Sequence, residues 1–200
     1  MSERSFFDVV LSQRAHRAFL PDPVGDDLIE RILAAATHAP SAENRQPWVF
    51  VVVRDAVERE KIAALVRELW TGGIGEMARQ RSGERLHADV DRWATANLGD
   101  APVIIVVCGD TTVAEEFLFP SSIFPAVQNL LLAAHALGLG SLLSTLPVLG
   151  GDRLAEILGL PAHVKPLAAI PVGHPARRLA APKREPFRTK TFRDRYGEPW

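Results

Sequence analysis

The sequence is poor in cysteine and carries no excess of charge of either sign. Its one cysteine, Cys108, has no partner for an internal disulfide, and its place in the apolar run VIIVVCGD predicts a small buried hydrophobic residue. The net charge of the 200-residue chain is −1, so no bulk field favours nucleic acid or an anionic membrane surface. We therefore expect neither kind of partner.

Long apolar stretches are also missing. The opening MSERSFFDVV lacks the basic start and the apolar segment of a signal peptide. No window reaches the roughly 18 apolar residues that a membrane-spanning helix needs. These absences predict a soluble protein of a reducing compartment, the cytoplasm.

The motifs of several common site types are absent. The chain has no G-x-S-x-G nucleophile turn, no Walker phosphate loop, and no G-x-G-x-x-G after a strand. Its six histidines lack the H-x-x-x-H spacing or the flanking C-x-x-C of a zinc site, so we expect no metal centre. Gly138 and Gly140 follow a helical pattern and predict a helix end and a turn. Hydrolase and Rossmann dinucleotide sites are therefore unsupported.

What is present is an ordinary globular composition, 47% hydrophobic and 24% charged, in a chain long enough for one domain with a sizeable core. Continuous apolar runs rich in β-branched residues predict strands covered on both faces. Apolar residues at helical spacing predict helices between them. The expected strands are 48–53, 103–108 and 166–173, and the expected helices are 4–12, 26–37, 55–70, 125–140 and 152–160. This order indicates an α/β or α+β sandwich.

Three segments have unusual compositions. Residues 70–100 are glycine-rich at the start and highly charged, which predicts helical excursions or a lid. Residues 176–200 are basic and interrupted by prolines, so we expect an arm that packs on something else. The helix at 125–140 is apolar almost all round, which places it in the core or at a subunit interface.

Two basic clusters could bind an anion: QRAHRAF near the N-terminus and PKREPFR near the C-terminus. If the first cluster forms a helical turn, Arg14 and Arg17 face the same way. Guanidinium groups suit bidentate binding of a phosphate monoester. A solvated charged face explains the same residues equally simply.

The segment RAHRAF, followed by PDPVGDDLIERILAAATHAPSAENRQPWVFVVV, resembles the opening of the nitroreductase-like flavoproteins. The resemblance continues in APVIIVV, PAVQNLLLAAHALGLGS, LAEILGLP, AAIPVGHPA and the KREP tail. It implies a single domain over residues 1–200, an α+β three-layer sandwich whose central, mainly antiparallel or mixed sheet is flanked by helices. It also implies an intertwined homodimer with two FMN molecules at its interface, and an arm, residues 176–200, that packs on the partner subunit.

The resemblance further implies which residues contact FMN. The A-P-S-x-x-N segment would line the flavin from one subunit, through Pro40, Ser41, Ala42 and Asn44. The basic turn of the other subunit would bind the phosphate and the flavin edge, through Arg14, Ala15 and Arg17. Ser144 and Thr145 would lie near the reactive face of the ring, and Lys183 and Arg184 on the phosphate.

Three positions depart from the pattern common in the family. Gln13 stands where many members have arginine, Ala15 where many have serine, and Leu146 where many have glycine. We expect fewer phosphate ligands as a result, and a bulkier side chain near the ring.

The activity implied by the resemblance is a ping-pong oxidoreductase reaction. NADH or NADPH would pass hydride to the flavin N5, and a flat, electron-poor acceptor such as a nitroaromatic or a quinone would then be reduced. Arg17 would stabilise the anionic reduced flavin. No side chain is proposed as a general acid, and His16 is the one alternative. Trp70, Trp93 and Met77 would either wall the acceptor site or form a small core within the lid.

Fold and cofactor do not choose between this reaction and others on the same fold. Dehalogenation, ene-type reduction, flavin fragmentation and deazaflavin-linked chemistry stay open as alternatives. So do a non-catalytic flavin carrier and a chain that binds no flavin.

Overall fold

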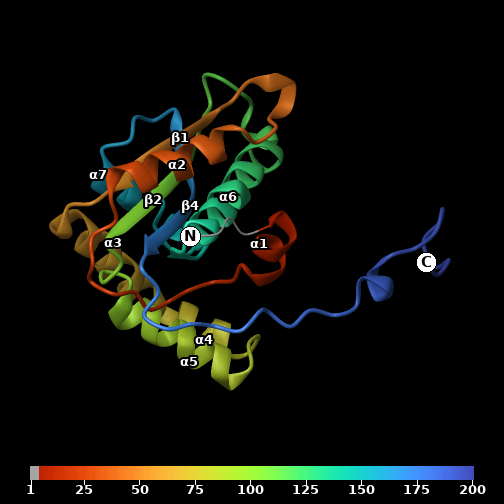
Figure 1. The fold of residues 1–200 in the computed structure, drawn as a ribbon. Coiled ribbons are helices and arrows are strands. Elements are labelled where there is room, and N and C mark those ends of the chain that lie inside the picture. The colour runs from red at the N-terminus through yellow and green to blue at the C-terminus, as the bar shows by residue number, and fades with distance from the viewer. Residues whose placement is uncertain (1–4) are drawn as a thin grey trace.

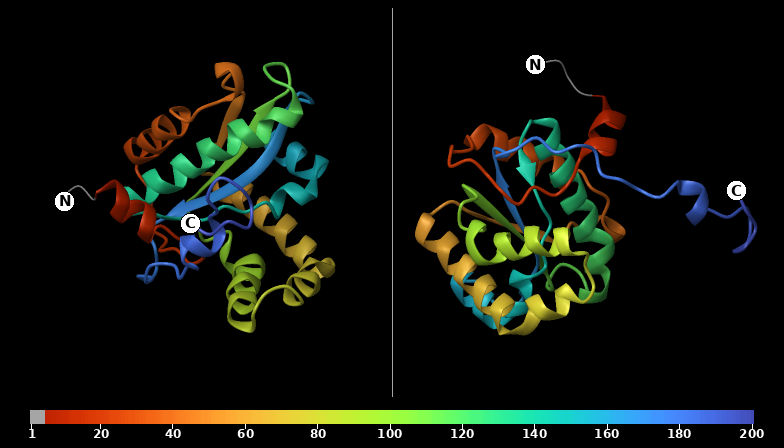
Figure 2. Two further views of the ribbon diagram at one scale, coloured as in Figure 1. Left: turned by 90° about the vertical axis from the view of Figure 1, so that its right-hand side faces the viewer. Right: turned by 90° about the horizontal axis from the view of Figure 1, so that it is seen from below.

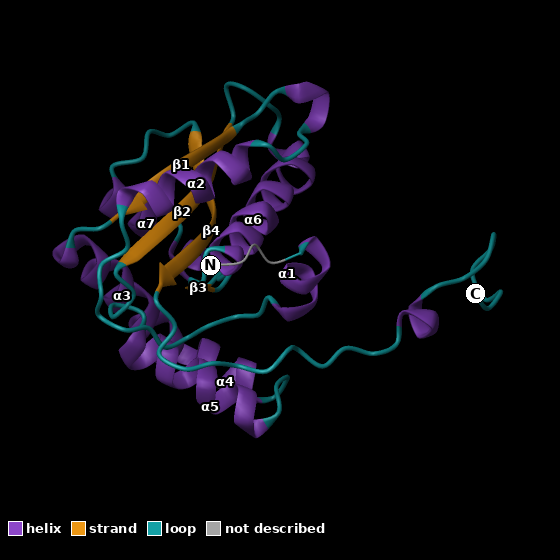
Figure 3. Ribbon diagram, viewed as in Figure 1, coloured by secondary structure: helices purple, strands orange, loops and turns teal. Residues whose placement is uncertain are grey.

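The computed structural model describes residues 5–200, and within them every side chain except that of Asn97. Four antiparallel strands form a sheet in the order β1-β2-β4-β3. The strands are β1 (Trp48–Val53), β2 (Val103–Asp110), β3 (Gly140–Ser141) and β4 (Val164–Gly173). Helices cover both faces of this sheet (Figure 1), and Figure 3 shows them as purple ribbons around the orange strands.

The central strand β2 is buried on both of its faces. Val103, Ile105 and Val107 belong to one hydrophobic core. Their neighbours Ile104 and Val106 belong to a second core on the opposite side of the sheet. Successive side chains of a strand point to opposite faces, so the continuous apolar run of β2 supplies both cores at once.

The two cores are completed by different helices. One core lies between the sheet and two helices on the same face, α2 (Asp26–Thr37) and α6 (Phe119–Ala136). The other is covered by α3 (Ala56–Leu69) and α7 (Asp152–Leu158). Figure 2 shows the resulting arrangement of helices, sheet and helices. The predicted α+β sandwich with a central antiparallel sheet is confirmed.

Local signals explain where several helices begin and end. The Ser5 hydroxyl accepts a hydrogen bond from the Asp8 N–H and caps α1 (Phe6–Ser12). The Asp55 carboxylate caps α3 in the same way, through the N–H groups of the first turn. Gly138, just beyond α6, has a φ of 82°, which glycine adopts without the steric cost of a side chain.

The prediction for α6 was wrong at both ends. The predicted helix spans residues 125–140 and so places Pro125 in its first turn. Pro120 occupies that first turn instead, and Pro125 lies inside the helix. An interior proline removes one backbone hydrogen bond, and the complete burial of Phe119 and Ile123 on the sheet offsets this loss. The helix ends at Ala136, before the glycine turn.

The other boundaries differ by a few residues. β2 continues to Asp110 and β4 begins at Val164, because main-chain pairing between these two strands runs past the apolar positions that the prediction followed. Helices α3 and α7 each end a residue or two earlier than expected. Helix α1 is described from Phe6 onward, and residue 4 of the predicted range lies outside the described residues.

By length and mean hydropathy, residues 116–136 could cross a membrane, contrary to the expectation that no segment would. Core helices of soluble proteins pass the same test. Here α6 packs along α2 and against the sheet, and eight of its residues are buried.

Residues 70–100 are almost entirely helical. A π-helical turn at Trp70–Ile74 leads into α4 (Gly75–Arg79), and α5 (Glu84–Arg92) is followed by a second π-helical turn at Trp93–Asn97. We call residues 70–97 the lid. In Figure 1 its helices lie at the lower end of the sheet.

The C-terminal arm leaves the body of the chain. Its backbone runs past the lid and extends away from every layer of the sandwich (Figures 1 and 2). It contains one short 3-10 turn at Phe187–Lys190, and residues 183–190 are exposed. Phe187, Tyr196 and Trp200 are also largely exposed.

Gly109, near the end of β2, tests the packing of α6 on the sheet. A Cβ at this position would lie 2.6 Å from Cε2 of the fully buried Phe119 ring. We expect Gly109→Ala to lower the free energy of unfolding by about 1–3 kcal/mol, since a close-packed core resists added volume. Chemical denaturation measures the effect. Gly72→Ala, where a Cβ meets nothing within 4 Å, is the control and should not be destabilised. Equal stability of the two variants would contradict this packing.

Candidate functional site

The basic turn, residues 13–18, is held to the sheet by main-chain hydrogen bonds. The N–H of His16 donates to the carbonyl of Ser141 over 3.0 Å, and the N–H of Ala176 donates to the carbonyl of Ala18 over 3.1 Å. These residues are extended and not helical. The helical turn considered for Arg14 and Arg17 is therefore wrong, because the backbone groups that would form it pair with the sheet edge.

A glycine permits this close pairing. A Cβ at Gly140 would lie 2.9 Å from the Cβ of His16. Gly140 thus lets the basic turn lie against β3. This is a role in addition to the turn that the sequence predicted.

The basic turn forms one wall of a cavity of about 640 Å³, which we call the basic cavity. Helix α5 and residues 177–183 form the other walls. Six cationic side chains and one acidic side chain line it: Arg14, Arg17, Arg85, Arg177, Arg178, Lys183 and Asp89. Such a concentration of one sign of charge favours an anionic ligand.

Among the described residues that line the basic cavity, Asp89 alone is acidic, and it is already engaged. Asp89 forms ion pairs with Arg92 at 3.5 Å and with Arg177 at 3.4 Å. Arg14 donates to the carbonyl of Ala180 over 2.8 Å, which ties the basic turn to the start of the arm. Burial lowers the pKa of Arg17, Asp89 raises it, and Arg14 lowers it. An arginine so placed stays charged at neutral pH and gains from a bound anion.

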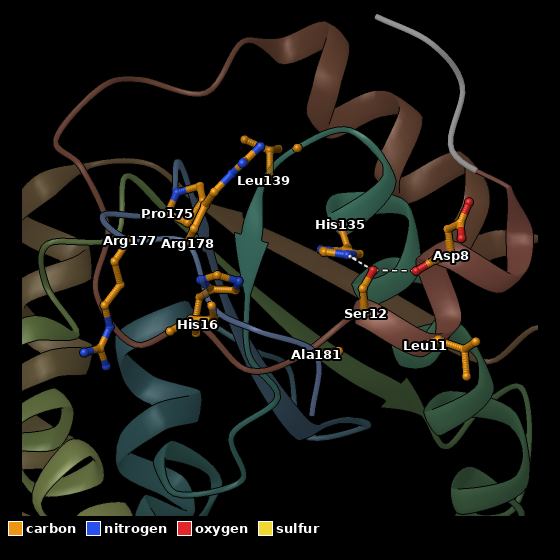
Figure 4. Close-up of a pocket in the computed structure, with 12 residues that line it drawn as sticks. Asp8, Leu11, Ser12, His16, His135, Leu139, Pro175, Arg177, Arg178 and Ala181 are labelled. Carbon is orange, nitrogen blue, oxygen red and sulfur yellow. Dashed lines mark hydrogen bonds between the residues drawn. The ribbon is translucent and has the colours of Figure 1, made fainter. Parts of the chain in front are cut away.

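A second cavity, of about 750 Å³, shares Arg177 and Arg178 with the basic cavity as lining residues (Figure 4). In it the Ser12 hydroxyl lies 2.8 Å from Nε2 of His135. Figure 4 shows Arg177 and Arg178 pointing in opposite directions. His16 lines both cavities. Burial lowers the pKa of His16 from 6.5 to about 4, with His135, Arg14 and Arg177 adding to the shift. The ring is therefore neutral at pH 7.

The loop at residues 41–46 has unusual backbone geometry. Glu43, Asn44 and Gln46 all have φ between 52° and 56°, in the left-handed region that non-glycine residues rarely adopt. The fully buried Ser122 accepts a hydrogen bond from the Ala42 N–H, and the Ser41 hydroxyl accepts one from the Gln46 N–H. Strained backbone of this kind collects at binding sites, and the Asn44 side chain is exposed.

Within one chain this loop lies far from the basic turn. The loop ends at Trp48, where β1 begins. At the other end of β1, Val53 pairs with Ile104 of β2. At this same end of the sheet β2 pairs with β4 and β4 pairs with β3, where Ser141 pairs with Ala15 of the basic turn. The six residues of β1 span about 20 Å. Figure 1 shows the loop at the upper end of the sheet, opposite the lid.

The segment after β3 is held along β4. Ser144 exchanges two main-chain hydrogen bonds with Ala169, and its hydroxyl accepts from the Leu146 N–H. Thr145 is exposed. The Leu146 side chain is buried in the second core. Its position relative to a bound ring stays a prediction.

The cofactor residues named from the sequence thus fall into separate groups. Arg14, Ala15, Arg17 and Lys183 line the basic cavity. Arg184 does not line it, and its guanidinium donates to the Lys183 carbonyl. The groups at Pro40–Asn44 and Ser144–Thr145 lie elsewhere on the sheet.

Sequence reasoning missed three arginines of the basic cavity and its one acid. Arg177 and Arg178 stand in the basic arm, and the adjacent pair was a usable signal. Arg85 and Asp89 lie among many charges of the lid, and nothing in their spacing indicates that α5 faces the basic turn.

No cluster of three or more potential metal ligands of the histidine, cysteine, aspartate or glutamate type occurs in the described part of the chain.

The buried His16 predicts a pH-dependent stability. Because its pKa falls to about 4 on folding, only the unfolded chain takes up this proton between about pH 6.5 and pH 4. Stability should decline over this window as the pH falls, by roughly 2–3 kcal/mol from this residue. Unfolding measured from pH 7 to pH 4 should show a flatter profile for His16→Gln than for the exposed control His163→Gln. Identical slopes would exclude a role for His16.

The chain is also similar to known proteins of one family. The family model described as Nitroreductase family matches residues 10–174. A protein of Methanothermobacter thermautotrophicus, provisionally named NADH dehydrogenase/NAD(P)H nitroreductase, is 30% identical over 88% of this chain and 80% of its own. Rat iodotyrosine deiodinase 1 is 31% identical over 91% of this chain, which spans 66% of that protein's length.

A solved structure shows the same fold. A provisionally named nitroreductase from Desulfovibrio desulfuricans, crystallised in complex with FMN, superposes with a TM-score of 0.76. It is 28% identical, and the match covers 98% of this chain and 99% of that one. Fold, motifs and the family match agree: the chain belongs to the nitroreductase family.

Proposed function

We propose that the protein is an FMN-dependent oxidoreductase, which takes hydride from NADH or NADPH and reduces a flat, electron-poor acceptor such as a nitroaromatic or a quinone. The observation that carries this proposal is the basic cavity, which gathers the arginines of the family's basic turn with Lys183 of the arm. Family membership and the FMN in the Desulfovibrio desulfuricans relative support the choice of cofactor.

The residues present fit the phosphate of FMN. Arg14, Arg17 and Lys183 can each donate charge-assisted hydrogen bonds to phosphate oxygens, and the acid beside them is neutralised by its own ion pairs. When bound, FMN supplies the hydride chemistry and serves the donor and the acceptor in turn. The chain would hold it through these cationic side chains, and half-buried Arg17 would stabilise negative charge on the ring.

The site needs two copies of the chain. The strained loop at 41–46 presents the exposed Asn44 amide, which can both donate and accept, but it lies about one strand length from the basic turn of its own chain. The loop of a second copy can approach that basic turn, and the extended arm, residues 176–200, offers a further contact between copies. We therefore propose a homodimer with shared sites.

Reductive dehalogenation is the second candidate. It is favoured by the similarity to iodotyrosine deiodinase 1 over 91% of this chain. The basic cavity is compatible with either reaction, since both would use the same cofactor.

The two-copy site makes a direct prediction. Arg14→Ala and Asn44→Ala should each weaken FMN binding, by roughly 1.5–3 kcal/mol if each removes a hydrogen bond to a charged or buried group. In a mixed dimer purified through two tags, one site carries both changes and the other carries none. FMN titration should then recover one site of wild-type affinity per dimer.

The control is Arg153→Ala, which removes an exposed arginine paired with Glu68 on α3. It should leave FMN affinity unchanged. A mixed dimer without any tight site would show that both residues act within one chain, and an unchanged Arg14→Ala variant would place the phosphate elsewhere.

An acceptor screen decides between the candidate reactions. The FMN-loaded protein should be bleached by NADH or NADPH under nitrogen, and its absorbance should return on adding a nitroaromatic or a quinone. Release of iodide from an iodinated phenol, without return of absorbance by the other acceptors, would favour dehalogenation. Failure of both nicotinamides to bleach the flavin would overturn the reductase.

A further inference from the structure

A third cavity, of about 620 Å³, lies under the lid. Its walls are largely apolar and come from the end of α3, the lid helices and the turn before α7, through Leu69, Trp70, Ile74, Met77, Leu86 and Leu149. The Trp70 ring is fixed because its Nε1–H donates to the Asp91 carboxylate over 2.8 Å. Trp93 takes no part in these walls and packs in the second core. The lid cavity suits a flat, apolar ligand.

The lid cavity and the basic cavity share one side chain. Arg17 lines both of them. A molecule in the lid cavity would therefore lie beside whatever the basic cavity holds. If the basic cavity holds FMN, as proposed above, the lid cavity is the place for the acceptor.

A second cation besides Arg17 lines the lid cavity, and it has no ion-pair partner among the described residues. This cation is Arg81, between α4 and α5. Two acids of α5 are already engaged, since Asp91 accepts from Trp70 and Asp89 pairs with Arg92 and Arg177. The third acid of this helix, Glu84, does not line the lid cavity. None of the described residues that line the lid cavity is acidic.

We propose that the lid cavity selects an aromatic acid, with the ring against the apolar walls and the carboxylate held by Arg81. This inference rests on the proposed function and narrows its acceptor class. Arg81 is a positioning residue, because it binds a group remote from the atoms that are reduced. Guanidinium and carboxylate match in planar, bidentate geometry, so a neutral isostere of the acid should bind less well.

The test compares 4-nitrobenzoate with the neutral 4-nitrobenzamide. Binding of each compound to the FMN-loaded protein is measured by calorimetry, and its reduction by NADPH gives kcat and KM. We expect wild type to bind the acid roughly 2- to 5-fold more tightly than the amide, because Arg81 is exposed and an exposed charge pair contributes little. Arg81→Gln should abolish this preference by raising KM for the acid while kcat stays unchanged.

Two variants control for indirect effects. Arg79→Gln removes an exposed arginine of α4 that does not line the lid cavity, and it should keep the preference. Arg81→Lys should restore part of it. Equal binding of acid and amide by wild type, or a preference that survives in Arg81→Gln, would overturn the assignment. Failure of the reductase would appear separately, as a flavin that neither the amide nor a quinone reoxidises.

Discussion

The structure depends on the pairing of an arginine-bearing segment with the end of a buried sheet. The backbone of residues 15–20 is hydrogen-bonded to β3 and to the residues after β4, and Gly140 leaves room for His16 against the strand. This fixes Arg14 and Arg17 relative to the sheet, whose central strand β2 is buried on both faces. Side chains supported by a sheet hold a ligand with less entropy loss than side chains on a free loop.

The position of the basic turn also explains why the charged basic cavity lies next to the apolar lid cavity. The basic cavity and the lid cavity meet at Arg17, which is half-buried between them. A flavin has a charged end and a flat ring system, and a partner for that ring needs apolar walls. One arginine that touches both spaces can hold the first molecule and face the second. The lid supplies these apolar walls and also contributes Trp70 and Trp93 to the second core.

Local residue patterns predicted much of the fold, but they did not predict much of the site. The six apolar residues of β1 and the helical spacing of α2 appear at their predicted boundaries, because burial on one or both faces is written directly in the residue pattern. The predicted start of α6 at residue 125 was too late, because the residue pattern gave no account of the buried turn around Phe119. Arg85 joins the basic cavity only because α5 folds back on the basic turn, and spacing along the chain carries no trace of that contact.

The loop before β1 has a consequence for how such a chain can change over evolutionary time. Three residues there keep side chains at backbone angles that glycine would occupy with less strain, at a cost on the order of 1 kcal/mol each. Drift toward stability would replace them with glycine, and the amide of Asn44 would be lost in the process. Where binding by these side chains is under selection, the strained residues should persist. Where it is not, glycine should replace them, and the protein should become more stable but bind its ligand less tightly.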